Sequence, residues 1–94
     1  MDATVNYNQA KDKEDAFARA KARITPEYVA KFQVRAEIDY NENNGIMTAK
    51  GKGFTLTLDF GPSSVGVKLD VSLLLRPLKG KIVDKIKREL ERNV

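Results

Sequence analysis

The side chains that most often carry catalysis near neutral pH are missing from this sequence. Its 94 residues include no histidine and no cysteine, so a catalytic site would need carboxylates, lysine, tyrosine, serine or threonine. Glu37 and Asp39 alternate with Arg35, which is typical of a charged surface rather than of an acid–base pair. Ser63 and Ser64 lie in a turn-like stretch, and no partner base can be identified for them. We therefore predict that the protein is not an enzyme.

Two short polar stretches have residue types that bind cations or phosphates. The stretch DYNENNG, residues 39–45, is rich in oxygen ligands, but Gly51 stands where a calcium loop would place its glutamate. The stretch KGKGF, residues 50–54, has glycines and lysines without the Walker spacing. A hairpin turn and a bent strand explain them better. We therefore predict no metal site and no cofactor.

Positive charge is concentrated in the last part of the chain. The net charge is +4; residues 1–75 hold ten basic and ten acidic residues, and residues 76–94 hold seven and three. Helical spacing gathers four of these basic residues on one face, and this basic helix face is our candidate site for an anionic partner. Nucleic acid is a weaker hypothesis, because no exposed aromatic side chains are predicted for base stacking. The four residues are Lys81, Lys85, Arg88 and Arg92.

Alternating apolar residues predict five strands, at residues 3–7, 34–42, 46–53, 54–60 and 65–73. The pattern places Val34 on the inward face of the second strand and ends the fifth strand with Leu73 pointing inward. Asn44-Gly45 predicts a type I′ hairpin between the second and third strands.

Helical spacing of apolar residues predicts two helical segments. The first segment covers residues 11–33 and ends at Gln33. Its apolar positions recur at helical spacing on both sides of Pro26. One kinked helix and two helices, the second capped by Thr25, both fit this pattern; we favour the kinked helix because the apolar side continues. The second segment begins at Pro77, and its buried side is predicted to contain Leu78, Ile82, Ile86 and Leu90.

The predicted order is β-α-β-β-β-β-α. An α+β two-layer sandwich, with an antiparallel sheet and both helices packed on one face, buries all the apolar sides together. The first strand is expected to pair with the fifth at the sheet edge, and residues 1–94 to form a single domain. A space beneath the helices could hold a small lipophilic ligand, with Tyr7, Tyr28 and Tyr40 as polar groups, although side chains filling that space are the simpler expectation.

The segment VKLDVSLLLRPLKGKIVDKIKREL, residues 67–90, is similar to the C-terminal part of the polyhydroxyalkanoic acid system protein family, which are small granule-region proteins. The shared pattern is a strand, a leucine-rich run, basic residues beside a proline, and an amphipathic helix rich in isoleucine. GKGFTLTLDF, residues 51–60, resembles the strand that comes before it in the family. Many members have a histidine shortly after the first strand, and NYNQAKDKED, residues 6–15, has none.

The resemblance implies a bacterial protein of storage-polyester metabolism, and it implies no catalytic residue. Our leading hypothesis is a non-enzymatic accessory or binding protein whose partner is the polyhydroxyalkanoate granule or a granule-associated protein. The alternatives are a carrier of a small lipophilic ligand and a nucleic-acid-binding regulator. Neither a signal peptide nor a transmembrane segment is predicted, so we expect a cytoplasmic location and a monomer or weak homodimer.

Overall fold

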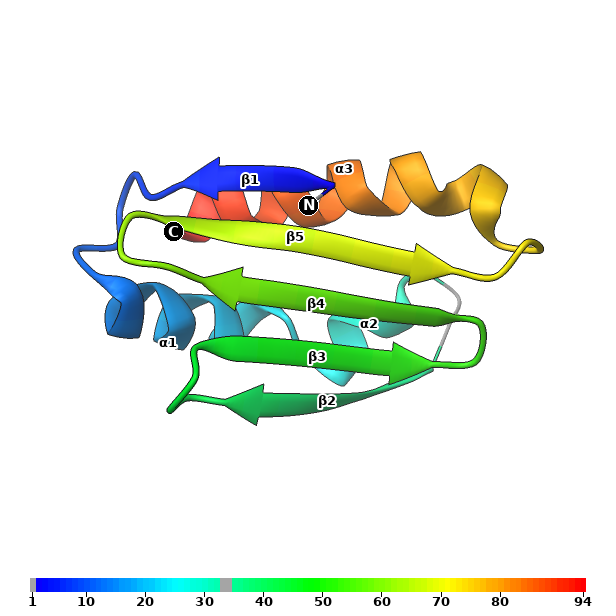
Figure 1. Cartoon of the computed structure of the whole chain (residues 1–94), viewed down its shortest axis with the longest axis horizontal. Helices are drawn as coiled ribbons and strands as arrows, with labels where there is room; N and C mark the ends of the chain where they lie inside the picture. Colours follow the sequence, from blue (N-terminus) through cyan, green and yellow to red (C-terminus); the bar gives the residue numbers. More distant parts are fainter. Residues whose placement is uncertain (1, 33–34) are drawn as a thin grey trace.

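A five-stranded antiparallel sheet forms one layer of the molecule, and the helices pack on one of its faces (Figure 1). This computed structural model describes residues 2–32 and 35–94. The predicted positions of Gln33 and Val34 lie outside the described residues. The strands lie in the order β1-β5-β4-β3-β2, which confirms the α+β sandwich and the pairing of the first strand with the fifth. The strands are β1 (Ala3–Asn6), β2 (Ala36–Asn41), β3 (Ile46–Gly51), β4 (Phe54–Phe60) and β5 (Ser64–Val71).

The core lies between the inward face of the sheet and the helices α1 (Lys13–Arg23), α2 (Pro26–Ala30) and α3 (Lys79–Asn93). Strand alternation turns every second side chain toward the helices, and these are the buried ones. Phe17 of α1 meets Phe60 of β4 edge to face, with ring centroids 5.2 Å apart. The fully buried large side chains include Ile24, Val29, Met47, Leu58, Phe60, Val65, Val67, Leu69, Ile86 and Leu90.

The chain breaks at Pro26 instead of kinking, so the favoured interpretation of one continuous helix was wrong. Proline disfavours the helical conformation at the residue before it, and Thr25 is extended, with φ −110° and ψ 164°. The Thr25 hydroxyl accepts a hydrogen bond from the Tyr28 amide at 3.2 Å, which caps α2 with Pro26 in its first turn. The apolar side still reaches the core, because α2 packs against β2.

The transition from β5 to α3 also differs from the prediction. Strand β5 ends at Val71, where its pairing with Phe54 of β4 is the last of the ladder. Leu73, predicted to point inward, has 77% of its surface exposed, and Leu78 has 43%. No neighbouring strand extends far enough to cover this part of the chain. A short 3-10 helix, η1 (Arg76–Leu78), contains Pro77 and leads into α3.

The β2–β3 hairpin is wider than the predicted two-residue turn. Asn41 pairs with Ile46, which leaves a loop of four residues between them. The side-chain oxygen of Asn41 accepts a hydrogen bond from the Asn44 amide at 3.2 Å and holds this loop. Gly45 has a positive φ of 67°, so glycine is required where the predicted turn also needed it.

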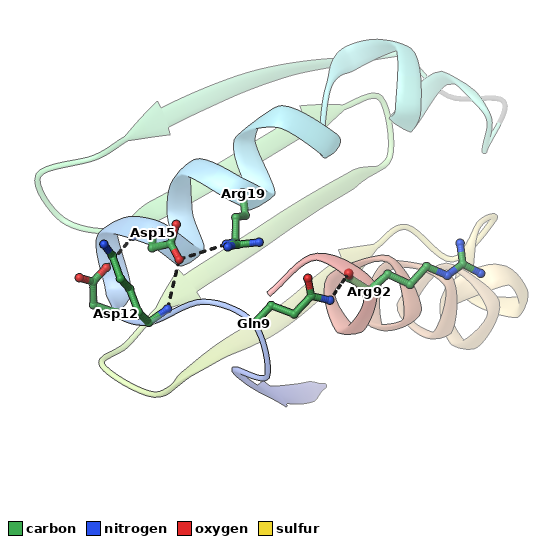
Figure 2. Close-up of polar contacts among 6 residues, drawn as sticks. Gln9, Asp12, Asp15, Arg19 and Arg92 are labelled. Carbon is green, nitrogen blue, oxygen red and sulfur yellow. Dashed lines mark hydrogen bonds and ion pairs between the residues drawn. The ribbon is translucent and has the colours of Figure 1, made fainter.

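The last residues of α3 are tied to the loop that follows β1. The backbone amides of Asn8, Gln9 and Ala10 all donate to the carbonyl oxygen of Val94, at 2.7, 2.8 and 2.8 Å. Figure 2 shows the side-chain amide of Gln9 donating to the backbone oxygen of Arg92, at 2.6 Å. This end of the molecule is therefore closed by hydrogen bonds.

The start of α1 is capped close to the same loop. The Asp12 carboxylate accepts from the Asp15 amide at 2.7 Å, which satisfies one of the free donors of the first turn. The Asp15 carboxylate accepts hydrogen bonds from the Lys11 amide and from Arg19 Nε, each at 3.1 Å (Figure 2). The Lys11 bond first, and then the Arg19 bond, lower the pKa of Asp15 below its ordinary value.

Candidate functional site

Three leucines are exposed together where β5 leads into α3. We call Leu73, Leu74 and Leu78 the leucine tip; their exposed fractions are 77%, 90% and 43%. Within residues 2–32 and 35–94 they are the only large apolar side chains that are exposed. The connection that carries them projects at one end of the long axis, at the right of Figure 1. Because these leucines are exposed together, this projection is our candidate docking surface.

The backbone of the leucine tip is held in place by hydrogen bonds. The Ser72 amide donates to the Gly53 carbonyl at 2.7 Å, and the Leu75 amide donates to the Ser72 carbonyl at 3.1 Å. The Leu78 amide donates to the Leu75 carbonyl at 2.9 Å. Leu75 itself is half-buried and packs against the core. The tip is thus a structured projection, so little conformational entropy would be lost when it binds a partner.

An open groove lies beside the leucine tip, between α3 and the chain at the end of α2. It has a volume of about 460 Å³. Its apolar lining is Phe32, Leu75, Leu78 and Ile82, and its rim is Lys31, Lys81 and Lys85. The Lys85 ammonium lies 5.9 Å from the centre of the Phe32 ring, within the range of a cation–π contact. The groove therefore combines an apolar floor with three positive charges.

The structure divides the predicted basic helix face into two parts. Lys81 and Lys85 line the groove. Arg88 pairs at 3.0 Å with Asp84, four residues earlier on the helix, and Arg92 lies 3.6 Å from Glu89. The two arginines therefore have carboxylate partners on their own helix. In the described part of the chain, no ion pair involves Lys81 or Lys85.

The leucine tip was missed as a functional feature because the sequence pattern assigned Leu73 to a strand and Leu78 to a buried helix side. One signal could have revealed it. The strand paired with β5 begins at Phe54, after a tight turn at Lys52-Gly53. A hairpin of this length leaves nothing to pair with Leu73.

The apolar gap between the sheet, α2 and α3 is too small to be a ligand cavity. The apolar gap lined by Val29, Phe32, Leu69, Ile82 and Ile86 holds about 10 Å³, which is about the smallest volume that one water molecule needs. A carrier that encloses a lipophilic ligand at this position, one of the alternatives drawn from the sequence, does not agree with this packing.

The three tyrosines use their hydroxyls to satisfy backbone carbonyls. Tyr7 donates to Gly61 at 2.7 Å, Tyr40 to Ile24 at 2.7 Å, and Tyr28 to Lys85 at 3.4 Å. Burial raises the pKa of Tyr7 and of Tyr28 to about 12. Their hydroxyls are therefore neutral donors at neutral pH, and they hold elements together rather than serving a bound ligand.

Within the described residues, the carboxylates of β2 and of the loop that follows it do not gather into a metal-binding group. Glu37 and Asp39 are exposed on β2, and no ion pair within the described residues involves them or Arg35. Glu42 lies in the loop between β2 and β3, whose sequence resembles part of a calcium loop, and it pairs with Lys21 at 3.1 Å. Residues 2–32 and 35–94 contain no group of three or more potential metal ligands.

A family model matches residues 4–94, nearly the whole chain, and its description is "Putative polyhydroxyalkanoic acid system protein" (PHA_gran_rgn). The chain belongs to this family. The match extends the resemblance seen in the C-terminal half into the first strand and α1. No curated protein and no solved structure matches the chain. None of the helices in the described residues has the length and hydropathy that a bilayer crossing requires.

Proposed function

We propose that this protein is a non-enzymatic accessory protein of bacterial polyhydroxyalkanoate metabolism that binds the surface of the polyester granule in the cytoplasm. Membership of the polyhydroxyalkanoic acid system family supports a role in storage-polyester metabolism. The observation that carries the proposal is the leucine tip, which presents three adjacent apolar side chains on a hydrogen-bonded projection. Leucine side chains can insert into the surface of a water-insoluble aliphatic polyester.

The leucine tip alone would give only weak, reversible binding, so docking also needs the charged residues beside it. Burying one leucine side chain contributes about 1.5–3 kcal/mol, so Leu73 and Leu74 together contribute roughly 3–6 kcal/mol. This gross value corresponds to dissociation constants between the millimolar and micromolar ranges before the cost of association is subtracted. Arg76 and Lys81 flank the tip and are exposed, and they would strengthen binding to a surface that carries negative charge by about 1 kcal/mol each.

The amphipathic side of α3 is not the docking surface in this proposal. Ile86 and Leu90 are each 1% exposed and pack on the sheet, so binding through that side would require α3 to separate from the core. The basic residues Arg88 and Arg92 have carboxylate partners, and this is why we rank a nucleic-acid-binding function below granule binding.

The test is sedimentation of purified protein with polyhydroxyalkanoate granules. We expect the native protein to sediment with the granules and the double variant Leu73→Ser/Leu74→Ser to bind roughly 100-fold more weakly or worse. Ile46→Ser is the matched control, because it removes an apolar side chain from the opposite, open face of the sheet. It should leave granule binding unchanged.

Three outcomes would overturn the proposal. In the first, the native protein stays in the supernatant. In the second, it binds anionic phospholipid vesicles but not granules, which makes it a membrane-binding protein. In the third, analytical ultracentrifugation shows a dimer that the double variant abolishes while granule binding persists, which makes the leucine tip a contact between two copies of the chain.

A further inference from the structure

The groove beside the leucine tip has the composition of a site for a small amphiphile. It is lined by apolar side chains along its floor and by three lysines along its rim. We propose that this groove binds a single-chain medium-length carboxylate, with the acyl chain on the floor of Phe32, Leu75 and Ile82 and the carboxylate among the ammonium groups of Lys31, Lys81 and Lys85. The proposal goes beyond granule docking and does not depend on it.

Charge complementarity selects the head group. Within residues 2–32 and 35–94, none of the three rim lysines takes part in an ion pair. Lys79, two residues before Lys81, differs because it pairs with Asp2 at 3.2 Å. The groove therefore presents positive charges that its own surroundings do not neutralise, and an anion supplies their missing partner. A carboxylate bound by ammonium groups makes charge-assisted hydrogen bonds, which are stronger than those of a neutral hydroxyl.

The floor and size of the groove select the tail. Its volume of about 460 Å³ lies within the range of small-molecule sites and can hold a medium-length chain, but it is open along one side. Phe32, Leu75 and Ile82 line both the groove and the narrow apolar gap beneath it. The groove floor is therefore apolar, and the core beneath it is apolar too. A methylene chain that covers this floor would not bury a polar group without a hydrogen-bond partner.

The only hydrogen bond between α2 and α3 in the described residues joins the Tyr28 hydroxyl to the Lys85 carbonyl, at 3.4 Å. This distance is long for an O–H donor. The two walls of the groove are therefore weakly tied to each other and can adjust to an occupant.

The test uses octanoate and 1-octanol as probes in amide NMR titrations of the full chain. We expect octanoate to shift the amides of Leu75, Ile82 and Lys85 in a saturable way, and octanol to shift the same amides with about 5- to 10-fold weaker binding. In the double variant Lys81→Gln/Lys85→Gln, the preference for octanoate over octanol should fall to about 2-fold or less, because only Lys31 remains on the rim. The matched control Lys50→Gln/Lys68→Gln removes two charges from the open sheet face and should preserve the preference.

The proposal is overturned if the native protein binds octanoate and octanol equally, if both double variants lose the preference equally, or if the shifted amides are scattered over the surface. Failure here can be told apart from failure of granule docking. The Leu73→Ser/Leu74→Ser variant, whose side chains lie outside the groove lining, should retain octanoate binding while it loses granule binding.

Discussion

The two ends of this 38 Å long molecule differ in whether their apolar side chains are buried and their polar groups are paired. At one end, the carbonyl oxygen of Val94 accepts three backbone hydrogen bonds, and the side chains of Val94 and Leu90 are buried. At the other end, the leucine tip leaves apolar side chains in water, and Lys81 and Lys85 have no carboxylate partner among the described residues. Figure 1 shows both ends of α3, the last residues at the left and its start beside the tip at the right.

The difference separates stability from function. A chain of this size buries a modest fraction of its surface, so each well-packed group at the closed end contributes noticeably to folding. Leu73 and Leu74 of the leucine tip contribute little to folding, because 77% and 90% of their surfaces stay exposed. These exposed leucines are the reason why we propose a partner that covers them.

Truncating one leucine at each end of the molecule should give the largest difference in stability between the two ends. Leu90→Ala removes a side chain that is 1% exposed, and we expect the free energy of unfolding to fall by about 2–5 kcal/mol. Leu74→Ala removes one that is 90% exposed, and we expect a change within about 0.5 kcal/mol. Urea denaturation followed by circular dichroism measures both values. Similar losses in the two variants would mean that the leucine tip is packed in solution, which would remove the basis for calling it a binding surface.

Two glycines extend the comparison to the backbone. Gly45, at the closed end, has φ 67°, and a Cβ there would lie 3.1 Å from the Phe60 carbonyl oxygen and would collide with the Lys13 side chain. Gly53, next to the leucine tip, has φ 85°, and its Cβ would meet the Ser72 hydroxyl at 3.1 Å. Alanine in the left-handed region costs about 1–2 kcal/mol.

We expect Gly45→Ala to lower the free energy of unfolding by about 2 kcal/mol and Gly53→Ala by about 1 kcal/mol. The order follows from the neighbours, because a backbone carbonyl held in the sheet cannot move aside and a serine hydroxyl can rotate. Thermal unfolding of both variants measures the difference. The reverse order would show that the chain around the leucine tip is the more rigid of the two ends.

The fold could be predicted from the sequence because its signals are local and agree with one another. The alternation in residues 54–60 and the spacing of Ile82, Ile86 and Leu90 each select one face, and only one arrangement buries all the faces. The break at Thr25 was harder to predict. It depends on whether a capping hydrogen bond outweighs the continuity of one helix, and the apolar pattern is the same in both cases.

The candidate site was less predictable because it depends on where elements stop relative to one another. Leu73 has the spacing of an inward strand residue, yet its exposure depends on β4 starting at Phe54. Lys81 and Arg88 are alike in sequence, and they differ because Asp84 reaches Arg88 while Lys81 faces the groove. Spacing along one helix carries no information about the chain near Phe32 that forms the other wall.

A smaller effect on stability is expected from the hydroxyl of Tyr7, which lies at the same end of the molecule as Val94. Tyr7→Phe removes the hydrogen bond to the Gly61 carbonyl and should lower the free energy of unfolding at pH 7 by about 1 kcal/mol. Burial raises the pKa of Tyr7 to about 12, above the ordinary value of about 10. The neutral hydroxyl therefore contributes its stability fully below pH 10, and this contribution is lost as the pH rises toward 12.

Urea denaturation between pH 7 and pH 11.5 tests this assignment. The native protein should lose stability above pH 10 more steeply than Tyr7→Phe, so the difference between them should shrink as the pH rises. Tyr28, whose pKa is also raised to about 12, titrates over the same range and is unchanged in both proteins. A constant difference across the whole range would mean that Tyr7 ionises normally and that its hydrogen bond does not hold the loop.

The smallest expected effect concerns the two arginines of α3. Arg88→Gln/Arg92→Gln removes exposed ion pairs at 3.0 and 3.6 Å, and such pairs contribute roughly 0–1 kcal/mol. We expect stability to change by less than about 0.5 kcal/mol, with both octanoate binding and granule binding unchanged. Lys81→Gln/Lys85→Gln makes the same change of charge two turns earlier on the same helix, and it should remove most of the preference for octanoate. If the arginine variant loses that preference instead, the long-range field of the whole helix attracts the anion, and the groove is not the binding site. The contrast between two pairs of charges on one helix therefore tests whether the free lysines, rather than the net charge of α3, make this end of the molecule a binding site.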